Sequence, residues 1–163
     1  MVTSAGKPTN WNRWDNAFKS AGSTFGVPWT WLKAIALNES SLGAYPSVAR
    51  GLASPTDIQG SKSQDGLSWG LMQVTIKTAR GLDPNATEVK LNDPIYSINL
   101  AAKYLSQLSS QFPKVDSRYV EYVIKSYNQG PGNTKKEIAS GKGYADEYWS
   151  RFQRNLEKVE AIA

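Results

Sequence analysis

A glutamate stands out in the sequence because it follows a helical stripe of apolar residues. In the segment Trp31–Leu42, which reads WLKAIALNESSL, Glu39 shares a helix face with Leu32, Ile35 and Ala36. A carboxyl group on this side of a helix is expected to have a raised pKa, because burial disfavours its charged form. An acid that stays protonated near neutral pH is suited to general acid catalysis. The alternative is a helix-end glutamate that turns to water.

The composition restricts the chemistry that can accompany this glutamate. The chain of 163 residues contains no cysteine and no histidine, which excludes thiol nucleophiles, disulfides, Cys/His zinc sites and Ser-His arrangements. Neither a GxxxxGK(S/T) phosphate loop nor a GxGxxG motif occurs. We therefore expect no metal and no cofactor, and a hydrolase would depend on Asp, Glu, Lys, Ser, Tyr or Asn side chains.

Charge and hydropathy narrow the choice of partners. The net charge of +5 and pI near 9.4 favour anionic polymers, namely nucleic acid, anionic lipid or bacterial cell wall. Basic residues are scattered and only Lys135 and Lys136 are adjacent, so we expect no nucleic-acid partner. The apolar stretches are far shorter than the roughly 20 residues of a spanning helix, so we expect no membrane insertion. The start MVTSAGKPTN lacks a charged region followed by an apolar block, so we expect no signal peptide in this chain.

Helical periodicity dominates the chain and predicts a mainly α protein. Residues 1–9 are expected to form a flexible tail, followed by a single domain over residues 10–163. Residues 43–68 are rich in Gly, Pro and Ser and predict a small irregular or β lobe. About seven helices are expected, over residues 10–25, 28–39, 74–80, 93–111, 116–129, 134–140 and 144–159.

Four short pieces of sequence occur in a distinctive order. They are Glu39-Ser40, Gly70-Leu71-Met72-Gln73, Tyr127-Asn128-Gln129-Gly130 and a late tyrosine, Tyr144. In this order they resemble the lysozyme-like lytic transglycosylases of the soluble (SLT) type, which are related to goose-type lysozymes. The resemblance covers residues 27–152. It implies an α+β lysozyme-like fold, with helices around a cleft and a small irregular or β lobe.

The resemblance also implies a substrate and a reaction. The substrate would be the glycan strand of peptidoglycan, cleaved at the β-1,4 bond between N-acetylmuramic acid and N-acetylglucosamine. Glu39 would protonate the leaving oxygen, and its carboxylate would then accept the proton of the sugar's own 6-hydroxyl. That second step closes a 1,6-anhydro ring, so one catalytic carboxyl group is sufficient.

The matched positions imply roles for further residues. Tyr127 and Asn128 would orient the N-acetyl group of the substrate and the catalytic carboxyl. Met72 and Gln73 would line the cleft, although simple core filling is the alternative for Met72.

Ser40, directly after Glu39, and Tyr144, late in the chain, also occupy matched positions. Ser40 would cap or orient the turn after Glu39. Tyr144 would hydrogen-bond Glu39 or the sugar, and the alternative is a core aromatic whose hydroxyl finds another partner.

A departure from the pattern leaves two alternative functions open. Goose-type lysozymes usually have Asp where this chain has Thr75, which weakens the case for a second catalytic carboxylate. Asp65 is the remaining candidate for a second acid that activates water, and a turn-forming Asp before Gly is the alternative. A goose-type muramidase that hydrolyses the same bond, or an inactive module that binds glycan, would be the alternative functions.

The implied substrate also suggests where the protein acts. Peptidoglycan lies outside the cytoplasmic membrane, so we expect action on the bacterial cell wall, in the periplasm or at a virion–host envelope. A phage endolysin, a virion-associated wall-degrading domain, a secretion-system transglycosylase and a bacterial domain without its leader all fit this sequence. We expect a monomer.

Overall fold

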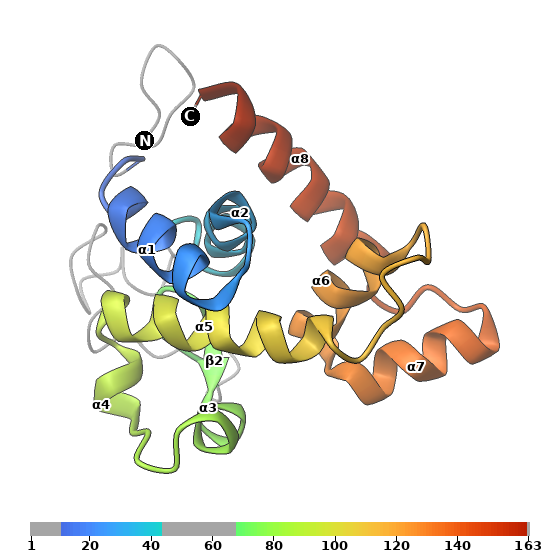
Figure 1. Ribbon diagram of the computed structural model, residues 1–163, viewed down its shortest axis with the longest axis horizontal. Coiled ribbons are helices and arrows are strands. Elements are labelled where there is room, and N and C mark those ends of the chain that lie inside the picture. Colours follow the sequence, from blue (N-terminus) through green and yellow to red (C-terminus); the bar gives the residue numbers. More distant parts are fainter. Residues whose placement is uncertain (1–10, 44–67, 163) are drawn as a thin grey trace.

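The computed structural model describes residues 11–43 and 68–162 of the chain. The predicted tail, most of the predicted irregular lobe and the candidate acid Asp65 lie outside these residues. Within them the protein is mainly helical, as predicted, with eight helices and one small antiparallel sheet (Figure 1). The elements are α1 (Asp15–Phe25), α2 (Trp29–Ser40), β1 (Ser68–Trp69), β2 (Val74–Thr75), α3 (Ile76–Leu82), α4 (Glu88–Leu91), α5 (Pro94–Ser109), α6 (Tyr119–Gln129), α7 (Pro131–Ser140) and α8 (Asp146–Ile162).

The helix α5 runs through the middle of the molecule and contacts helices on several sides (Figure 1). It packs against α1 and α2, against α3 and α4, and against α6. The last helix, α8, returns from the far end of the chain to pack against α2 and α6. This return brings the C-terminal helix beside the glutamate-bearing helix.

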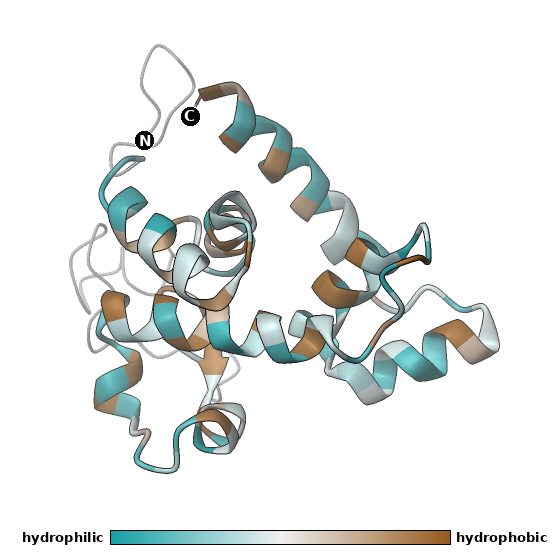
Figure 2. Cartoon of the chain, in the orientation of Figure 1, coloured by the Kyte–Doolittle hydropathy of each residue, from teal (hydrophilic) through white to brown (hydrophobic). Residues whose placement is uncertain are grey.

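The core consists of the apolar stripes of these helices. Phe18, Leu32, Ile98 and Phe152 are fully buried and come from four different helices. Figure 2 shows α8 as a largely hydrophilic helix interrupted by hydrophobic bands, as expected for a helix with one buried face. Every helix within the described ranges is too short or too polar to serve as a membrane span.

Several helix ends agree with the prediction and others differ. The helix start at Asp93 and Pro94 is confirmed, because Asp93 Oδ1 accepts a hydrogen bond from the Ile95 amide at 3.0 Å. The helix expected from residue 116 begins instead at Tyr119, because Asp116 accepts the amide of Arg118 in a turn. The last helix begins at Asp146 rather than Tyr144, and the short helix α4 was not predicted.

The two strands form a tight hairpin that requires a glycine. Ser68 pairs with Thr75 and Trp69 with Val74, and Gly70 begins the turn with φ of 79°. A Cβ atom on Gly70 would lie 2.0 Å from the backbone oxygen of Leu91. The hairpin therefore approaches the backbone before α5 more closely than any side chain at position 70 would allow.

A buried lysine joins the three C-terminal helices. Lys125 on α6 is fully buried and its Nζ lies 2.7 Å from carboxylate oxygens of both Glu121 and Asp146. It also donates to Glu137 on α7. Burial alone would lower the pKa of Lys125, but hydrogen bonds to these carboxylates outweigh it and raise the pKa well above its usual value. The cluster thereby fixes the start of α8 against α6 and α7.

We expect Lys125→Met to destabilise the fold by about 3–5 kcal/mol near neutral pH, because it leaves the buried carboxylate of Glu137 without its cationic partner. Burial raises the pKa of Glu121, but hydrogen bonds from Arg118 and Lys125 leave it below its usual value. A lowered carboxyl pKa contributes stability that is lost as pH falls through the folded-state pKa. The deficit of the variant should therefore shrink in acid.

Urea unfolding of both proteins, at about pH 7 and again below the pKa of an unfolded glutamate, about 4.3, measures this difference. Lys136→Met removes an exposed lysine from α7 and serves as the control, with a change within about 0.5 kcal/mol. An equal deficit for Lys125→Met at both pH values would contradict the expectation.

Candidate active site

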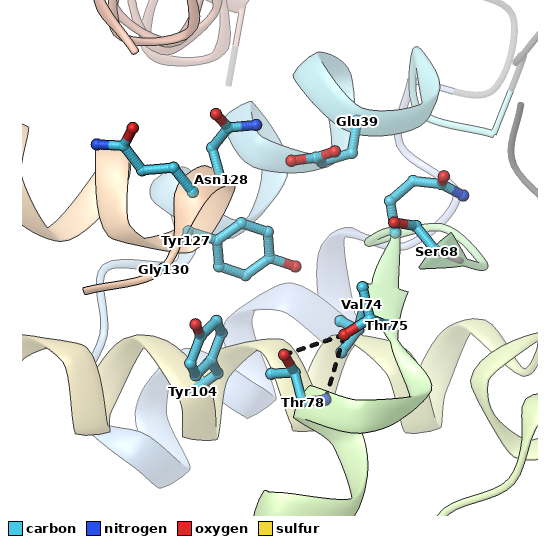
Figure 3. Close-up of a pocket in the computed structure, with 11 residues that line it drawn as sticks. Glu39, Ser68, Val74, Thr75, Thr78, Tyr104, Tyr127, Asn128 and Gly130 are labelled. Atoms are coloured by element: carbon cyan, nitrogen blue, oxygen red, sulfur yellow. Dashed lines mark hydrogen bonds between the residues drawn. The ribbon is translucent and has the colours of Figure 1, made fainter. Parts of the chain in front are cut away.

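Glu39 opens onto a cavity of about 340 Å³ that lies between α2, the hairpin, α3, α5 and α6 (Figure 3). Most of its described lining consists of uncharged polar side chains. The described lining residues are Glu39, Ser68, Gln73, Val74, Thr75, Thr78, Tyr104, Tyr127, Asn128, Gln129 and Gly130. A polar cavity of this size beside a carboxyl group can hold a hydroxyl-rich ligand.

The end of α2 determines where Glu39 points. Leu32, Ile35 and Ala36 on the same face are fully buried, while Glu39 is half-buried at the edge of this stripe. Just after it the backbone turns sharply, because Ser41 and the residue that follows both have positive φ angles. Such a conformation is costly for residues other than glycine and is concentrated at functional sites. The turn ends the helix directly after the glutamate and leaves its carboxylate over the cavity (Figure 3).

A tyrosine from the C-terminal helix holds this carboxylate. Tyr148 on α8 donates a hydrogen bond from its hydroxyl to Glu39 Oε2 at 2.6 Å. Burial raises the pKa of Tyr148 well above its usual value, and the charge of Glu39 raises it further. The phenol therefore remains a donor over the working pH range of most enzymes, and it restricts the orientation of the carboxyl group.

Tyr148 rather than the expected Tyr144 donates a hydrogen bond to Glu39, and the expected contact of Tyr144 with the sugar stays a prediction. The side chain of Tyr144 is 59% exposed, lies before α8 begins, and is not among the described residues of the cavity. Tyr148, one helical turn later, supplies the hydrogen bond. Both tyrosines lie within the helix expected over residues 144–159, and the matched sequence pieces pointed only to Tyr144.

The helix α8 is also tied to α2 beside the glutamate. Asn38 donates a hydrogen bond to the backbone oxygen of Tyr148 at 3.2 Å. Its own side-chain oxygen accepts a hydrogen bond from Asn155, further along α8. These two contacts fix the position of Tyr148 along α2 and support its contact with Glu39.

The side chains of Ser40 and Met72 are buried and do not belong to the described lining of the cavity. Ser40 is fully buried and donates to the backbone oxygen of Leu71 at 2.8 Å, while its hydroxyl accepts the amide of Gly43. It thus orients the turn after Glu39, as one of the two predictions for it said, but it does not reach the described cavity lining. The side chain of Met72 is also fully buried, so core filling, the alternative interpretation, describes it.

Tyr127 and Gln73 line the cavity and at the same time hold the hairpin. The hydroxyl of Tyr127 donates to the backbone oxygen of Met72 at 2.7 Å, and in Figure 3 it points toward the hairpin. Gln73 has a positive φ of 51°, and its side-chain amide donates a hydrogen bond to the backbone oxygen of Gly70 at 2.8 Å. These hydrogen bonds hold the backbone of the hairpin in place, and this backbone forms one wall of the cavity.

Asn128 is the predicted site residue that is exposed inside the cavity. It follows Tyr127 on α6, and Figure 3 shows its amide on the side of the cavity toward which the carboxylate of Glu39 points. An amide in this position can donate to a ligand carbonyl and accept from a ligand hydroxyl or amide.

The cavity also contains residues that the sequence did not indicate as site residues. Thr75 and Thr78 bond to each other, with 3.0 Å between their hydroxyl oxygens, and Tyr104 faces them from α5 (Figure 3). The ring of Tyr104 lies 5.6 Å from that of Tyr127. Thr78 lies outside the matched motifs and Gln129 was assigned no role within its motif, so only the folded chain reveals them as lining residues. Among the described lining residues, Glu39 has the one carboxyl group.

The family comparison agrees with this geometry. The family model described as "Transglycosylase SLT domain" matches residues 16–150, which include α2, the hairpin and the start of α8. The chain belongs to the transglycosylase SLT domain family. It is thus a lytic transglycosylase family enzyme.

A curated relative of this SLT domain carries a consistent name. The chain is similar to "Membrane-bound lytic murein transglycosylase F" of Cellvibrio japonicus (strain Ueda107), with 31% identity over 124 residues. The aligned segment makes up 74% of this chain but 21% of the relative. The match with this chain thus spans about a fifth of the length of that relative.

In this SLT domain we expect Tyr148→Phe to reduce the rate of peptidoglycan release about ten- to a hundredfold. The variant keeps the ring but loses a hydrogen bond to a carboxylate, which contributes about 1.5–3 kcal/mol. The measurement is the initial rate of sacculus solubilisation.

Tyr144→Phe is the matched control, since it removes the same hydroxyl from an exposed ring, and its rate should equal that of the parent. Equal losses in the two variants, or a larger loss for Tyr144→Phe, would contradict the assignment of Tyr148.

Proposed function

We propose that this domain cleaves the β-1,4 bond between N-acetylmuramic acid and N-acetylglucosamine as a lytic transglycosylase, with Glu39 as acid and then base. The observation that supports this most directly is the single carboxyl group among the described residues of the cavity. Most glycosidases place a second carboxylate across the cleft as nucleophile or base. Here the described residues around Glu39 offer hydroxyls and amides instead.

In the first step, the carboxylic acid of Glu39 gives its proton to the glycosidic oxygen. The bond from that oxygen to the anomeric carbon of the muramic acid breaks, and positive charge develops on the sugar ring. The N-acetyl carbonyl of the same sugar stabilises this charge. Asn128 is positioned to orient the N-acetyl group through its amide, because it is exposed on the cavity wall.

In the second step, Glu39 acts as a base. Its carboxylate takes the proton of the 6-hydroxyl of the muramic acid, and the oxygen bonds to the anomeric carbon to close the 1,6-anhydro ring. The acid is thereby regenerated and no water is consumed. Tyr148 keeps one carboxylate oxygen in a fixed hydrogen bond, so the carboxyl group needs little reorientation between the two steps.

A muramidase that uses water is the second candidate. Its support in the sequence is Asp65, which stays a prediction because it lies outside the described residues. The position at which goose-type lysozymes usually have Asp is Thr75, whose hydroxyl is bonded to Thr78 inside the cavity. A neutral threonine hydroxyl cannot readily take a proton from water, so its presence at this position favours the transglycosylase reaction.

We infer that the domain acts as a monomer on the cell wall and that its partner is the glycan strand rather than nucleic acid. The net charge of +5 suits an anionic wall polymer. The relative from Cellvibrio japonicus is named as a murein transglycosylase, and neither comparison supports a phage endolysin or a virion-associated domain.

We expect wild-type protein to release muropeptides that are one water lighter than hydrolysis products and carry 1,6-anhydro ends. Glu39→Gln should lower this release at least about a thousandfold, since the amide can neither donate the acidic proton nor act as base. Mass spectrometry of the products from purified peptidoglycan measures both quantities.

Glu157→Gln makes the same change on the exposed face of α8 and should leave the rate unchanged. Products with free reducing ends would make the protein a muramidase and bring Asp65 back as second acid. Binding without any release would favour an inactive glycan-binding module.

A further inference from the structure

A second hollow continues the catalytic cavity on the side away from Glu39. It has a volume of about 530 Å³ and lies between α3, α5 and the start of α7. Thr78, Tyr104 and Gly130 line both the catalytic cavity and this second hollow. The two spaces therefore adjoin at these three residues, and a substrate held at Glu39 can extend toward the hollow.

The lining of the second hollow differs chemically from that of the catalytic cavity. Leu82, Pro131 and the ring of Tyr104 provide apolar surface. The catalytic cavity is instead lined largely by hydroxyl and amide side chains. A sugar ring, with a hydroxyl on most of its carbons, would leave many of its hydrogen bonds unmet against apolar walls. The hollow is better suited to a part of the substrate that carries methyl groups.

Among the residues that the structure describes, a cation and an amide at the rim of the hollow have no polar partner. Lys77 is exposed, and neither it nor the side chain of Gln107 forms a hydrogen bond or ion pair with any residue in the described ranges. The neighbouring basic residues are engaged, since Lys103 donates to the backbone oxygen of Leu82 at 2.7 Å and Arg80 lies 3.8 Å from Glu88. Lys77 is therefore available to an anionic ligand in the hollow.

We propose that this hollow binds the stem peptide carried by the peptidoglycan strand, and that Lys77 pairs with a carboxylate of that peptide. The inference rests on the proposed function, because the peptide is attached to the muramic acid whose glycosidic bond is cleaved. Alanine methyl groups fit the apolar walls, the backbone amides of the peptide can bond to Gln107, and its free carboxylates match the charge of Lys77. The domain would then prefer strands that still carry their peptides.

The test compares two soluble glycan fragments of equal length, one with its stem peptides and one from which an amidase has removed them. Binding is measured by calorimetry on the Glu39→Gln variant, so that neither fragment is cut. We expect the peptide-bearing fragment to bind about fivefold more tightly, because a solvent-exposed ion pair and modest apolar contact contribute a small increment. Added salt should reduce this ratio.

Three further substitutions in the same background identify the source of the preference. Lys77→Gln should reduce the affinity ratio at least about threefold, while Lys77→Arg should keep it, because the charge is retained. Lys114→Gln is the matched control and should also keep the ratio. Lys114 is exposed on the α5–α6 connection and has no ion pair with any described residue.

A parent that binds both fragments equally, or fails to bind either, would overturn the proposal. An unchanged ratio in Lys77→Gln would overturn the role of Lys77 and leave bare glycan as the occupant of the hollow. These outcomes are separate from the chemistry at Glu39. Free reducing ends in the products of wild-type protein would contradict the proposed reaction, whereas the binding ratio does not depend on which product forms.

Discussion

The hydrogen bond between Tyr148 and Glu39 joins the two ends of the chain at the reacting group. Its partners are 109 residues apart, on the helices α2 and α8, and the contact is 2.6 Å long. A carboxyl group at the edge of a buried helix face needs a polar partner, because an unpaired one is costly to bury. Several other contacts of the structure position the phenol ring of Tyr148 against Glu39. Asn38 bonds the Tyr148 backbone, and Lys125 pairs with Asp146 at the first turn of α8.

The residues of the Gly-Leu-Met-Gln turn serve mainly as backbone. Two of its carbonyl groups receive hydroxyls from other elements, since Ser40 donates to Leu71 and Tyr127 donates to Met72. Gly70 allows the turn to lie against the backbone before α5, and only the side chain of Gln73 reaches the cavity. Such a turn is over-determined by contacts from α2, α4 and α6, which is how a strained segment persists. The motif therefore builds the wall of the site more than it contacts the ligand.

The sequence predicted the parts of this protein that depend on local pattern. Apolar periodicity identified the buried face that leads to Glu39, and the helix expected over residues 93–111 starts where α5 has its N-cap, Asp93. The choice between Tyr144 and Tyr148 depended on where α8 begins, and a helix start is uncertain by a few residues in a single sequence. Thr78 lies outside the matched motifs and Gln129 was assigned no role within its motif, because only tertiary packing brings both side chains to one cavity.

The distribution of acids across the described chain gives the cleft its electrostatic character. Glu121, Glu137 and Asp146 converge on Lys125, and Asp15 pairs with the buried Lys33. Other carboxylates support turns and helix starts, as Asp83, Asp93 and Asp116 do. Apart from Glu39, no acid in the described ranges lines either part of the cleft. An anionic strand thus meets little repulsion there, and the unpaired Lys77 adds a local attraction. Placing the structural acids away from the cleft keeps Glu39 chemically distinct, because no described neighbour in the cleft competes with it for a proton.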